Sequence, residues 1–392
     1  MSEWKKCAIG NVVTLRQGFA INAKSKHYIS KEPTSLALLR IADMKSGSRE
    51  IYVKEDIPKN FIALPQDIIY TRTGNVGLVF RNNYGVVHNN CFTVTPNDER
   101  TLSRDFLYYL LQSKYFFEKA NSLARGAAQP DLPHSLFNSI EIAYPELDSQ
   151  QRIASILSRY DSLIENYQKQ IKLLEEAAQR LYKEWFVDLH FPGHENTKIV
   201  DGVPEGWEKG RLEDIAFESG KKVDKKSRED YEYYMPIDSL PKHSLTYLSP
   251  ADISMAESSL VSFKEGDVIF GAMRPYFHKV CFAQSSGLTR STCFVLNAKV
   301  QEYQGYLLML MFDENTVKHA TSISVGTTMP YTRWKEFKSM QILIPSKDLA
   351  TIFGEQISLT TKRLKKLSTQ IRLLTEARDR LLPKLMSGEI AV

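Results

Sequence analysis

Two long stretches of the 392-residue chain place apolar residues at alternating steps of four and three. This spacing is typical of the buried seam of a coiled coil, and a helix of about 35 residues is roughly 50 Å long. We therefore predict two long helices. The seam positions of the first are Ile153, Leu157, Tyr160, Ile164, Tyr167, Ile171, Leu174, Ala178, Leu181 and Trp185, and those of the second are Phe353, Ile357, Leu364, Leu367, Ile371, Leu374, Leu381 and Leu385.

The segments that precede the two long helices have a different pattern. Short apolar and β-branched runs, such as 67–71, 77–80, 267–270 and 293–296, are interrupted by Gly, Asn and Pro. These runs predict short strands, and helical stretches are expected around 104–124 and 303–319. Both segments are therefore predicted to be mixed α/β heads.

The two heads resemble each other at a constant offset of 200 residues. Asp67 and Asp267 coincide, several residues of 126–145 recur in 326–345, and Ile171 matches Ile371. A constant offset across separated blocks predicts a tandem duplication. Asp67 and Asp267 are interpreted as turn residues that open a strand, although their recurrence is also compatible with catalysis.

The predicted fold is α+β, with two similar heads, a pseudo-two-fold internal repeat and two long helices that form an antiparallel coiled coil. The alternative is that each apolar stripe packs only on its own head. The expected segments are head one (1–148), the first helix (149–190), a linker (191–206), head two (207–346) and the second helix (347–390).

Composition narrows the classes of protein that fit. The net charge of +5 is compatible with a nucleic-acid partner, while the four cysteines form no CxxC pair and show no zinc-finger spacing. We find neither a signal peptide nor an apolar run long enough for a membrane span. We therefore expect a cytoplasmic protein that has no membrane contact.

Two similar heads on a rigid spacer suit the reading of DNA, because half-sites on one face of a duplex lie roughly 34 Å apart. Arg pairs with guanine and Asn or Gln with adenine, so polar loops in the heads are candidate contacts, although each could be a solvated turn. Because the heads differ, we expect an asymmetric, interrupted site. The candidates are Arg72, Thr73, Asn75, Arg81, Asn89, Asn90, Arg125 and Gln129 in head one, and Lys221, Lys222, Arg274, Tyr276, His278, Lys279, Arg290, Thr327 and Thr328 in head two.

The sequence shows no recognisable catalytic motif. It has neither a phosphate-binding GxxxxGK[ST] loop nor a GxGxxG cofactor turn, and most of its eight histidines lack metal-ligand spacing. His190 and His194 are four residues apart, but they flank Pro192-Gly193 and are interpreted as part of a linker turn, not as metal ligands. We predict no catalytic residue, no cofactor and no metal. Two alternatives remain: an enzyme with unrecognised motifs, and a coiled-coil scaffold or DNA-binding regulator without a role in restriction or modification.

Several strings resemble the specificity (S) subunits of Type I restriction-modification systems. They are RLLPKLMSGEI at 380–390, LYKEWFVD at 181–188, VPEGW at 203–207 and SQQRI at 149–153. The resemblance covers essentially the whole chain. Residues 348–352, with the sequence DLATI, depart from the fuller SQQRI form, so the two partner-docking surfaces need not be equally strong.

The resemblance implies a non-catalytic subunit with two target-recognition domains, each of which reads half of a bipartite site in double-stranded DNA. The coiled coil would set the gap between the halves and dock two modification (methyltransferase) subunits, which carry S-adenosylmethionine, and restriction subunits would join the full complex. The residues assigned to the coil and its partners are Ile164, Ile171, Leu174, Leu181, Trp185, Leu364, Ile371, Leu374, Leu381 and Leu385.

Overall fold

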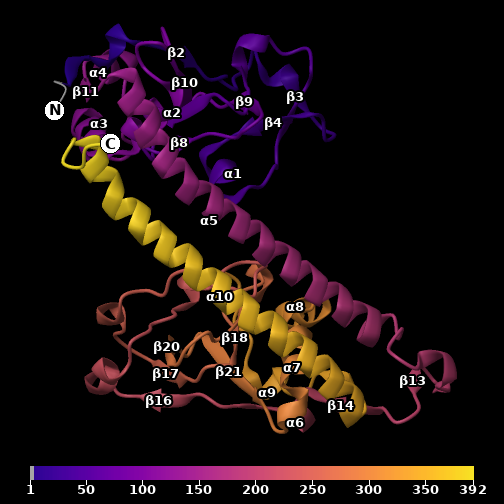
Figure 1. Cartoon of the computed structure of the whole chain (residues 1–392). Helices are drawn as coiled ribbons and strands as arrows, with labels where there is room; N and C mark the ends of the chain where they lie inside the picture. The colour runs from indigo at the N-terminus through magenta and orange to yellow at the C-terminus, as the bar shows by residue number, and fades with distance from the viewer. Residues whose placement is uncertain (1–3) are drawn as a thin grey trace. The chain divides into compact units, whose positions relative to one another are not determined.

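A computed structural model describes residues 4–392, and the contacts within the chain divide it into two units (Figure 1). Unit 1 comprises the residues up to Asp161 together with Glu376–Val392, and unit 2 is Ser162–Thr375. Both long helices run through this division. Each unit therefore contains one head and a part of each long helix.

The main sheet of unit 1 is antiparallel and four-stranded, in the order β2-β10-β7-β8. Tyr70 and Phe92 lie in the core on one side of this sheet and are fully buried, while their strand neighbours Ile69 and Cys91 belong to a separate buried cluster. Three helices cover them and contribute Phe106, Phe116 and Phe137 to the same core. These elements are β2 (Val13–Gln17), β7 (Ile68–Thr71), β8 (Val79–Phe80), β10 (Cys91–Pro96), α2 (Arg104–Gln112), α3 (Lys114–Leu123) and α4 (His134–Asn138).

A second sheet in unit 1 has five short strands in the order β3-β5-β4-β9-β6 and a small core of its own around Leu38 and Val86. A separate pair joins β1 to β11, so the start of the head lies beside its end. The bounds are β1 (Lys5–Ala8), β3 (Ile29–Ser30), β4 (Leu36–Leu39), α1 (Ile41–Ser46), β5 (Tyr52–Val53), β6 (Ile62–Ala63), β9 (Gly85–Val87) and β11 (Glu141–Tyr144).

Unit 2 repeats this plan. Its four-stranded sheet has the order β15-β21-β18-β19, which is the order of unit 1, and β14 pairs with β22 as β1 pairs with β11. The predicted duplication is therefore confirmed. The bounds are α6 (Leu212–Ile215), β14 (Glu208–Arg211), β15 (Ala216–Glu218), β18 (Val268–Gly271), β19 (Val280–Phe282), β21 (Cys293–Ala298), α7 (Gln304–Phe312), α8 (Glu314–Ser322), α9 (Trp334–Phe337) and β22 (Gln341–Ile344).

The two heads differ in their second sheets. Unit 2 has three strands in the order β16-β17-β20, where unit 1 has five. These strands are β16 (Lys221–Val223), β17 (Leu260–Phe263) and β20 (Gly287–Arg290). The residues between the long helix and head two include a short hairpin of β12 (Ile199–Val200) and β13 (Val203–Pro204).

The long helices are α5 (Leu147–Tyr182), which continues as a π-helical segment (Lys183–Val187), and α10 (Lys347–Met386). In unit 2, the rings of Phe186 and Phe353 lie 4.7 Å apart, so the end of one helix packs beside the start of the other. In unit 1, Arg378 donates to Asp161 at 2.8 Å, and the start of α5 shares a core with the end of α10. Within each unit the helices are therefore antiparallel, as predicted.

The apolar stripes also pack on the heads. In unit 2 one continuous core contains Ile171 of α5, Leu364 of α10 and Tyr306 of head two. The rings of Phe186 and Tyr306 lie 4.8 Å apart. The predicted pairing of the two helices is therefore confirmed. The alternative, that each stripe packs only on its own head, is wrong, because each stripe is wide enough to contact both the other helix and a head. No helix among residues 4–392 is long and apolar enough to cross a membrane.

Leu364 tests the contribution of this shared core. Its side chain is fully buried, whereas Leu359, one and a half turns earlier on α10, is 63% exposed. We expect Leu364→Ala to lower the free energy of unfolding by about 2–5 kcal/mol, because the substitution leaves a cavity between the helices and the head. Leu359→Ala, the matched control, should change it by less than about 0.5 kcal/mol. Urea denaturation of both variants measures the difference. Equal effects of the two substitutions would contradict the assignment of Leu364 to the core between the helices and the head.

Candidate nucleic-acid interface

Three loops meet at one end of the four-stranded sheet in head one. They are 72–77 after β7, 88–90 before β10, and 124–131 after α3. The backbone amides of Arg72 and Thr73 donate to the carbonyl of Asn90 at 2.8 and 3.2 Å, and that of Gly74 donates to Pro130 at 2.8 Å. The structure thus brings together most of the DNA-contacting candidates of head one.

The guanidinium of Arg72 is held in place from two sides. It donates to both carboxylate oxygens of Asp131, at 2.7 and 3.1 Å, and to Gln17 Oε1 at 3.1 Å. Thr73 Oγ1 donates to the same carboxylate at 2.6 Å. These hydrogen bonds, above all those from Arg72, lower the pKa of Asp131 below its ordinary value. Gln17 also donates to the carbonyl of Asn89 at 2.7 Å.

Asp131 and Gln17 therefore order the surface, and sequence reasoning missed both. The local signal is that Asp131 lies in the same loop as Gln129 and follows it by two residues. Asn75, Arg125 and Gln129 are exposed, and Asn89 and Asn90 are half-buried. The exposed side chains can therefore contact a ligand, while the half-buried residues hold the three loops together. These hydrogen-bonded loops form the frame of the surface.

Head two builds the same arrangement from different residues. The backbone amide of Arg274 donates to Pro330 at 2.7 Å, that of Met273 to Thr292 at 3.3 Å, and that of Thr332 to Ala272 at 2.9 Å. The side chain of Arg274 also donates to the carbonyl of Thr328 at 3.1 Å. The exposed candidates at this surface are Tyr276, Arg290, Thr327 and Thr328.

Glycine closes the outer loop in both heads. Gly126 and Gly326 have φ of 98° and 109°, in the left-handed region that favours glycine. A Cβ on Gly126 would also lie 2.8 Å from the carbonyl oxygen of Gln129. The two loops therefore share one backbone shape, while the residues between the glycine and Pro130 or Pro330 differ.

Three candidates do not reach these surfaces. Arg81 pairs with Asp161 and Asp105 and lies over the ring of Tyr108, 4.1 Å from its centroid. His278 is only 3% exposed. Lys279 donates to the carbonyl of Ile237 at 2.6 Å, and burial lowers the pKa of its ammonium. The side chains of all three are engaged by other residues of the heads.

Lys221 and Lys222 lie apart from the three loops. Both are exposed on β16, an edge strand of the three-stranded sheet. Lys222 pairs with Val261 of β17, which in turn pairs with Thr289 of β20. Strands are about 4.8 Å apart, so these lysines lie roughly 10 Å from the strand that ends at Arg290.

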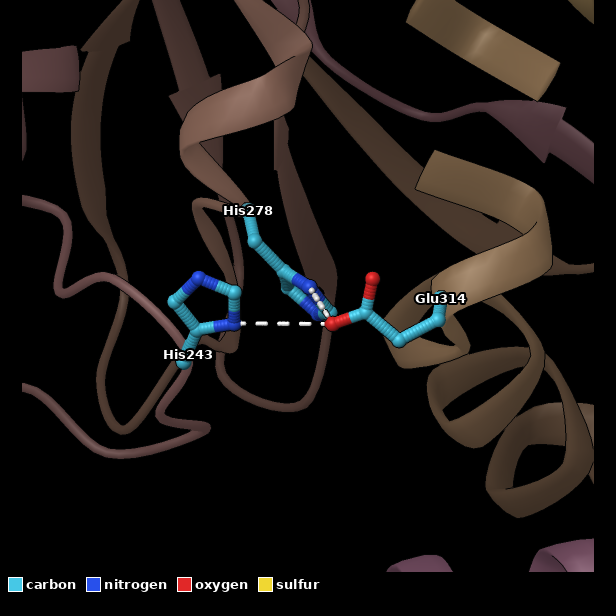
Figure 2. A group of neighbouring side chains, drawn as sticks. All are labelled: His243, His278 and Glu314. Carbon is cyan, nitrogen blue, oxygen red and sulfur yellow. Dashed lines mark hydrogen bonds and ion pairs between the residues drawn. The ribbon is translucent and has the colours of Figure 1, made fainter. Parts of the chain in front are cut away.

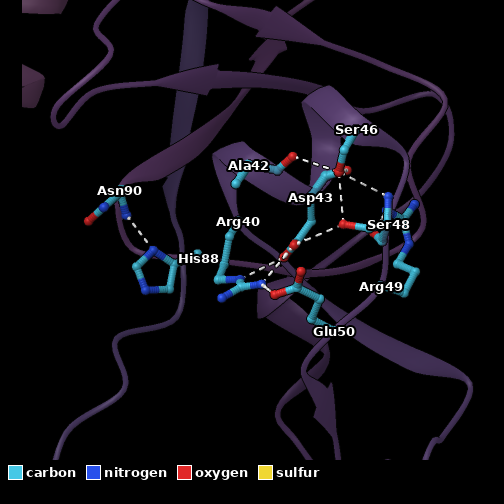
Figure 3. A network of polar contacts seen from close by, with 9 residues as sticks. All are labelled: Arg40, Ala42, Asp43, Ser46, Ser48, Arg49, Glu50, His88 and Asn90. Atoms are coloured by element: carbon cyan, nitrogen blue, oxygen red, sulfur yellow. Dashed lines mark hydrogen bonds and ion pairs between the residues drawn. The ribbon is translucent and has the colours of Figure 1, made fainter. Parts of the chain in front are cut away.

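A network of polar contacts links residues 40–50, which connect β4 to β5 of the second sheet (Figure 3). Arg40 donates to both carboxylate oxygens of Asp43, at 2.7 and 2.8 Å, and to Glu50 at 2.5 Å. Burial acts to raise the pKa of Asp43, but the hydrogen bonds and charge of Arg40 lower it overall. Burial and the charge of Arg40 lower the pKa of the nearby His88, whose Nδ1 accepts from the backbone amide of Asn90 at 3.3 Å.

The residues assigned to the coil lie mostly within it. Five of them, Ile164, Ile171, Leu364, Ile371 and Leu385, are 9% exposed or less, and the other five are half-buried against the same cores. They therefore contribute to pairing of the helices. Other apolar residues of the two helices face solvent in unit 2: Leu163, Leu173, Ile352, Leu359 and Leu373.

A family model described as the Type I restriction modification DNA specificity domain matches the chain twice, over residues 1–176 and 204–380. The two matches coincide with the two repeats. They account for most of the chain, and each covers a head together with most of the helix that follows it.

Two curated proteins of Methanocaldococcus jannaschii are similar to the chain. The MjaIX specificity subunit of a Type I restriction enzyme is 28% identical over 420 residues, which cover 100% of this chain and 94% of that protein. The MjaVIII specificity subunit is 24% identical over 358 residues, covering 85% and 81%. A solved Type I S subunit from M. genitalium has a similar fold, with a TM-score of 0.64, 18% identity and coverage of 98% and 96%.

The Arg40–Asp43 pair makes stability depend on pH. Because the pKa of Asp43 is lowered in the folded chain, its contribution is present above the ordinary value of 3.8 and is lost as the pH falls below that value. At pH 7 we expect Asp43→Asn to cost about 1–3 kcal/mol, since it breaks a nearly buried charged pair. We expect the difference in free energy of unfolding between the unaltered chain and Asp43→Asn to be smaller near pH 3 than at pH 7. Denaturation of both proteins at the two pH values measures this difference.

Glu50→Gln is the matched control for this prediction. It removes the other carboxylate that contacts Arg40, but Glu50 is 66% exposed. Exposed ion pairs contribute about 0–1 kcal/mol. A cost as large as that of Asp43→Asn, or a cost of Asp43→Asn that is the same at both pH values, would contradict the assignment.

Proposed function

Because the chain belongs to the Type I restriction modification DNA specificity family, a non-catalytic part of Type I restriction-modification complexes, we propose that each of its heads reads one half of an asymmetric, bipartite site in double-stranded DNA. The observation that carries this proposal is the three-loop surface, which recurs in both heads with different exposed side chains. Equivalent frames with unlike side chains suit two unlike half-sites.

Within each surface the residues divide into two groups. Asn75, Arg125 and Gln129 in head one are exposed and carry the groups that pair with guanine or adenine edges. Arg72, Thr73, Asn89 and Asn90 contribute to the frame and present backbone and half-buried polar groups at its base. In head two the base-reading candidates are Arg274, Tyr276, Arg290, Thr327 and Thr328.

Lys221 and Lys222 are assigned to phosphates. An edge strand with exposed lysines offers charge without a fixed geometry, which suits the sugar-phosphate backbone better than a base edge. Their position beside the strand that ends at Arg290 would let them contact the duplex next to the bases that head two reads.

The partners are two modification (methyltransferase) subunits, joined by restriction subunits in the full complex. We assign their docking to the solvent-facing side of the helix pair in unit 2. Leu359 projects from α10 about 180° around from Ser368, since nine residues make two and a half turns. Ser368 reaches head two, where its hydroxyl lies 2.6 Å from Gln284 Oε1. Leu359 therefore faces away from the head.

The same geometry holds on α5. Leu173 lies about 160° around from Glu175, whose carboxylate accepts from Ser244 and from the backbone of Leu245 in head two at 2.8 and 2.9 Å. Exposed leucines at several positions on one side of a helix pair form the kind of apolar patch that marks a protein interface. The length of the helices would also set the gap between the half-sites, and the DNA target implies a cytoplasmic protein.

Arg125 and Gln129 test the division between the heads. We expect Arg125→Ala with Gln129→Ala, in the assembled methyltransferase, to relax the bases accepted in one half-site and leave the other unchanged. Each lost base contact should cost about 1–3 kcal/mol of discrimination. The measurement is the sequence methylated in a DNA library. The matched variant Thr327→Ala with Thr328→Ala should relax only the other half, and changes in both halves from either variant would refute modular reading.

Lys221→Ala with Lys222→Ala serves as the phosphate control. This pair should weaken binding to all sequences alike and make it less sensitive to salt, because fewer counterions are released. A change in the methylated sequence would instead assign these lysines to bases.

Leu359 and Leu373 test the docking of the modification subunits. They are 63% and 52% exposed, so Leu359→Glu with Leu373→Glu should leave the fold intact. We expect the affinity for the modification subunit to fall at least about tenfold, since each change places a charge in an apolar interface. Co-purification and titration calorimetry measure this. Leu64→Glu, at a 44% exposed leucine of head one, is the control. Unchanged affinity in the double variant would exclude this face.

A further inference from the structure

Head two contains a cluster of two histidines and a glutamate (Figure 2). His243 lies in the loop after a 3-10 turn (Ile237–Ser239), His278 directly follows another (Pro275–Phe277), and Glu314 is the first residue of α8. Glu314 Oε1 lies 3.1 Å from His278 Nδ1 and 3.6 Å from His243 Nδ1. One ligand atom from each residue lies within 4.8 Å of the others.

The hydrogen bonds of His278 fix which of its nitrogens carries a proton. Nε2 lies 2.9 Å from the carbonyl oxygen of Phe312, which can only accept, so Nε2 carries the hydrogen. Nδ1 of the neutral ring then has a lone pair that points at a carboxylate oxygen, and two acceptors face each other at 3.1 Å. A proton, carried by the ring or by the carboxyl group, or a metal ion must therefore lie between them.

We propose that His243, His278 and Glu314 bind a divalent first-row transition metal ion such as Zn²⁺. Two imidazoles and one carboxylate are donors that zinc accepts, and bonds of about 2.0 Å in a tetrahedral site place ligand atoms roughly 3.3 Å apart. The separations of 3.1 and 3.6 Å lie on either side of this value. A metal-bound histidine usually donates its other N–H to a carbonyl or carboxylate, as His278 does to Phe312.

The surroundings of the cluster leave room for a metal ion. The cluster borders a pocket of about 600 Å³ that Glu175, Glu176 and Asp313 also line. The pocket gives an ion an entry path and leaves room for a water as the fourth ligand.

The backbone at both histidines is strained. His243 and His278 have φ of 51° and 49°, in a region that non-glycine residues seldom occupy. The amide of His243 donates to the carbonyl of His278 at 2.9 Å, so the two strained positions brace each other. Strain of this kind persists where the surroundings require it and is concentrated at ligand sites. In this backbone conformation both imidazole rings lie next to the Glu314 carboxylate (Figure 2).

A bound ion would connect the turn that precedes His278 to helix α8. His278 ends the turn that begins at Arg274 and carries the exposed Tyr276, both of which are proposed to contact DNA. A metal bond to Glu314 fixes the end of that turn to α8. This consequence rests on the proposed function, whereas metal binding itself does not.

Cobalt binding to the purified full-length chain tests the site, because Co²⁺ replaces Zn²⁺ and absorbs visible light when bound by nitrogen and oxygen ligands. We expect the chelator-treated chain to bind one equivalent of Co²⁺, to release it on addition of Zn²⁺, and to melt at a higher temperature with either ion. His243→Ala and Glu314→Gln should each weaken binding by at least roughly a hundredfold, since even the loss of an outer-shell partner costs about 10- to 100-fold.

His190→Ala with His194→Ala is the matched control, because these two rings, 5.3 Å apart, are another histidine pair in unit 2. This variant should bind like the unaltered chain. No cobalt absorption in the unaltered chain, or absorption that survives His243→Ala and Glu314→Gln, would overturn the proposal. His243 is 62% and Glu314 57% exposed, so both variants should fold, and circular dichroism checks this. Because no DNA is present, failure here leaves the proposed function untouched.

Discussion

The burial of two apolar stripes is the constraint on which the structure depends. A single long helix with one apolar side is not stable alone in water, because most helical stability in proteins comes from packing of that side. Here each stripe is covered twice, by the other long helix and by a head. In unit 2 a single core joins Ile171, Leu364 and Phe270, which belong to α5, α10 and the sheet of head two.

This shared core has a consequence for rigidity. Side chains in a close-packed core cannot move independently, so the helix pair and the head in one unit are expected to act as one body. Polar contacts at the border reinforce it: the buried Glu175 accepts from Ser244 and Leu245, and burial raises the pKa of its carboxyl. Within a unit, the three-loop surface proposed to contact DNA is therefore expected to be fixed with respect to the helix segments that pack on the same core.

The sequence predicted the features that depend on periodicity. Heptad spacing located the long helices, and the offset of 200 residues identified two heads whose sheets do share one strand order. Asp67 and Asp267, interpreted as turn residues, each accept the backbone amide three residues earlier, at 3.0 and 2.8 Å. These features are local, or they repeat, and so a single sequence records them.

Features that depend on tertiary contacts were not predictable in this way. Arg72 and Arg81 look alike in sequence, yet Arg72 lies at the proposed surface and Arg81 pairs with Asp161 on a distant helix. His243, His278 and Glu314 are separated by 35 and 36 residues, so no short sequence motif contains all three. Conversely, the departure at 348–352 has a visible effect. Gln150 makes three side-chain hydrogen bonds that hold the start of α5 against head one. Its counterpart Ala350 has only a methyl group, which cannot form hydrogen bonds.

The frame of each reading surface is held by the backbone and by a few buried side chains, and this separates specificity from stability. Loops 72–77 and 124–131 are joined by backbone hydrogen bonds, such as that from Gly74 to Pro130, and by the side chains of Arg72 and Thr73, which donate to Asp131. None of these bonds requires a particular residue at the exposed positions. Equivalent backbone hydrogen bonds join the loops of head two, whose exposed side chains are different. If these surfaces read DNA as proposed, substitution at an exposed position changes which bases are read at little cost in folding free energy, since surface changes away from special contacts are usually within about 0.5 kcal/mol. A duplicated fold with this property can keep two heads alike in structure while they diverge in what they recognise.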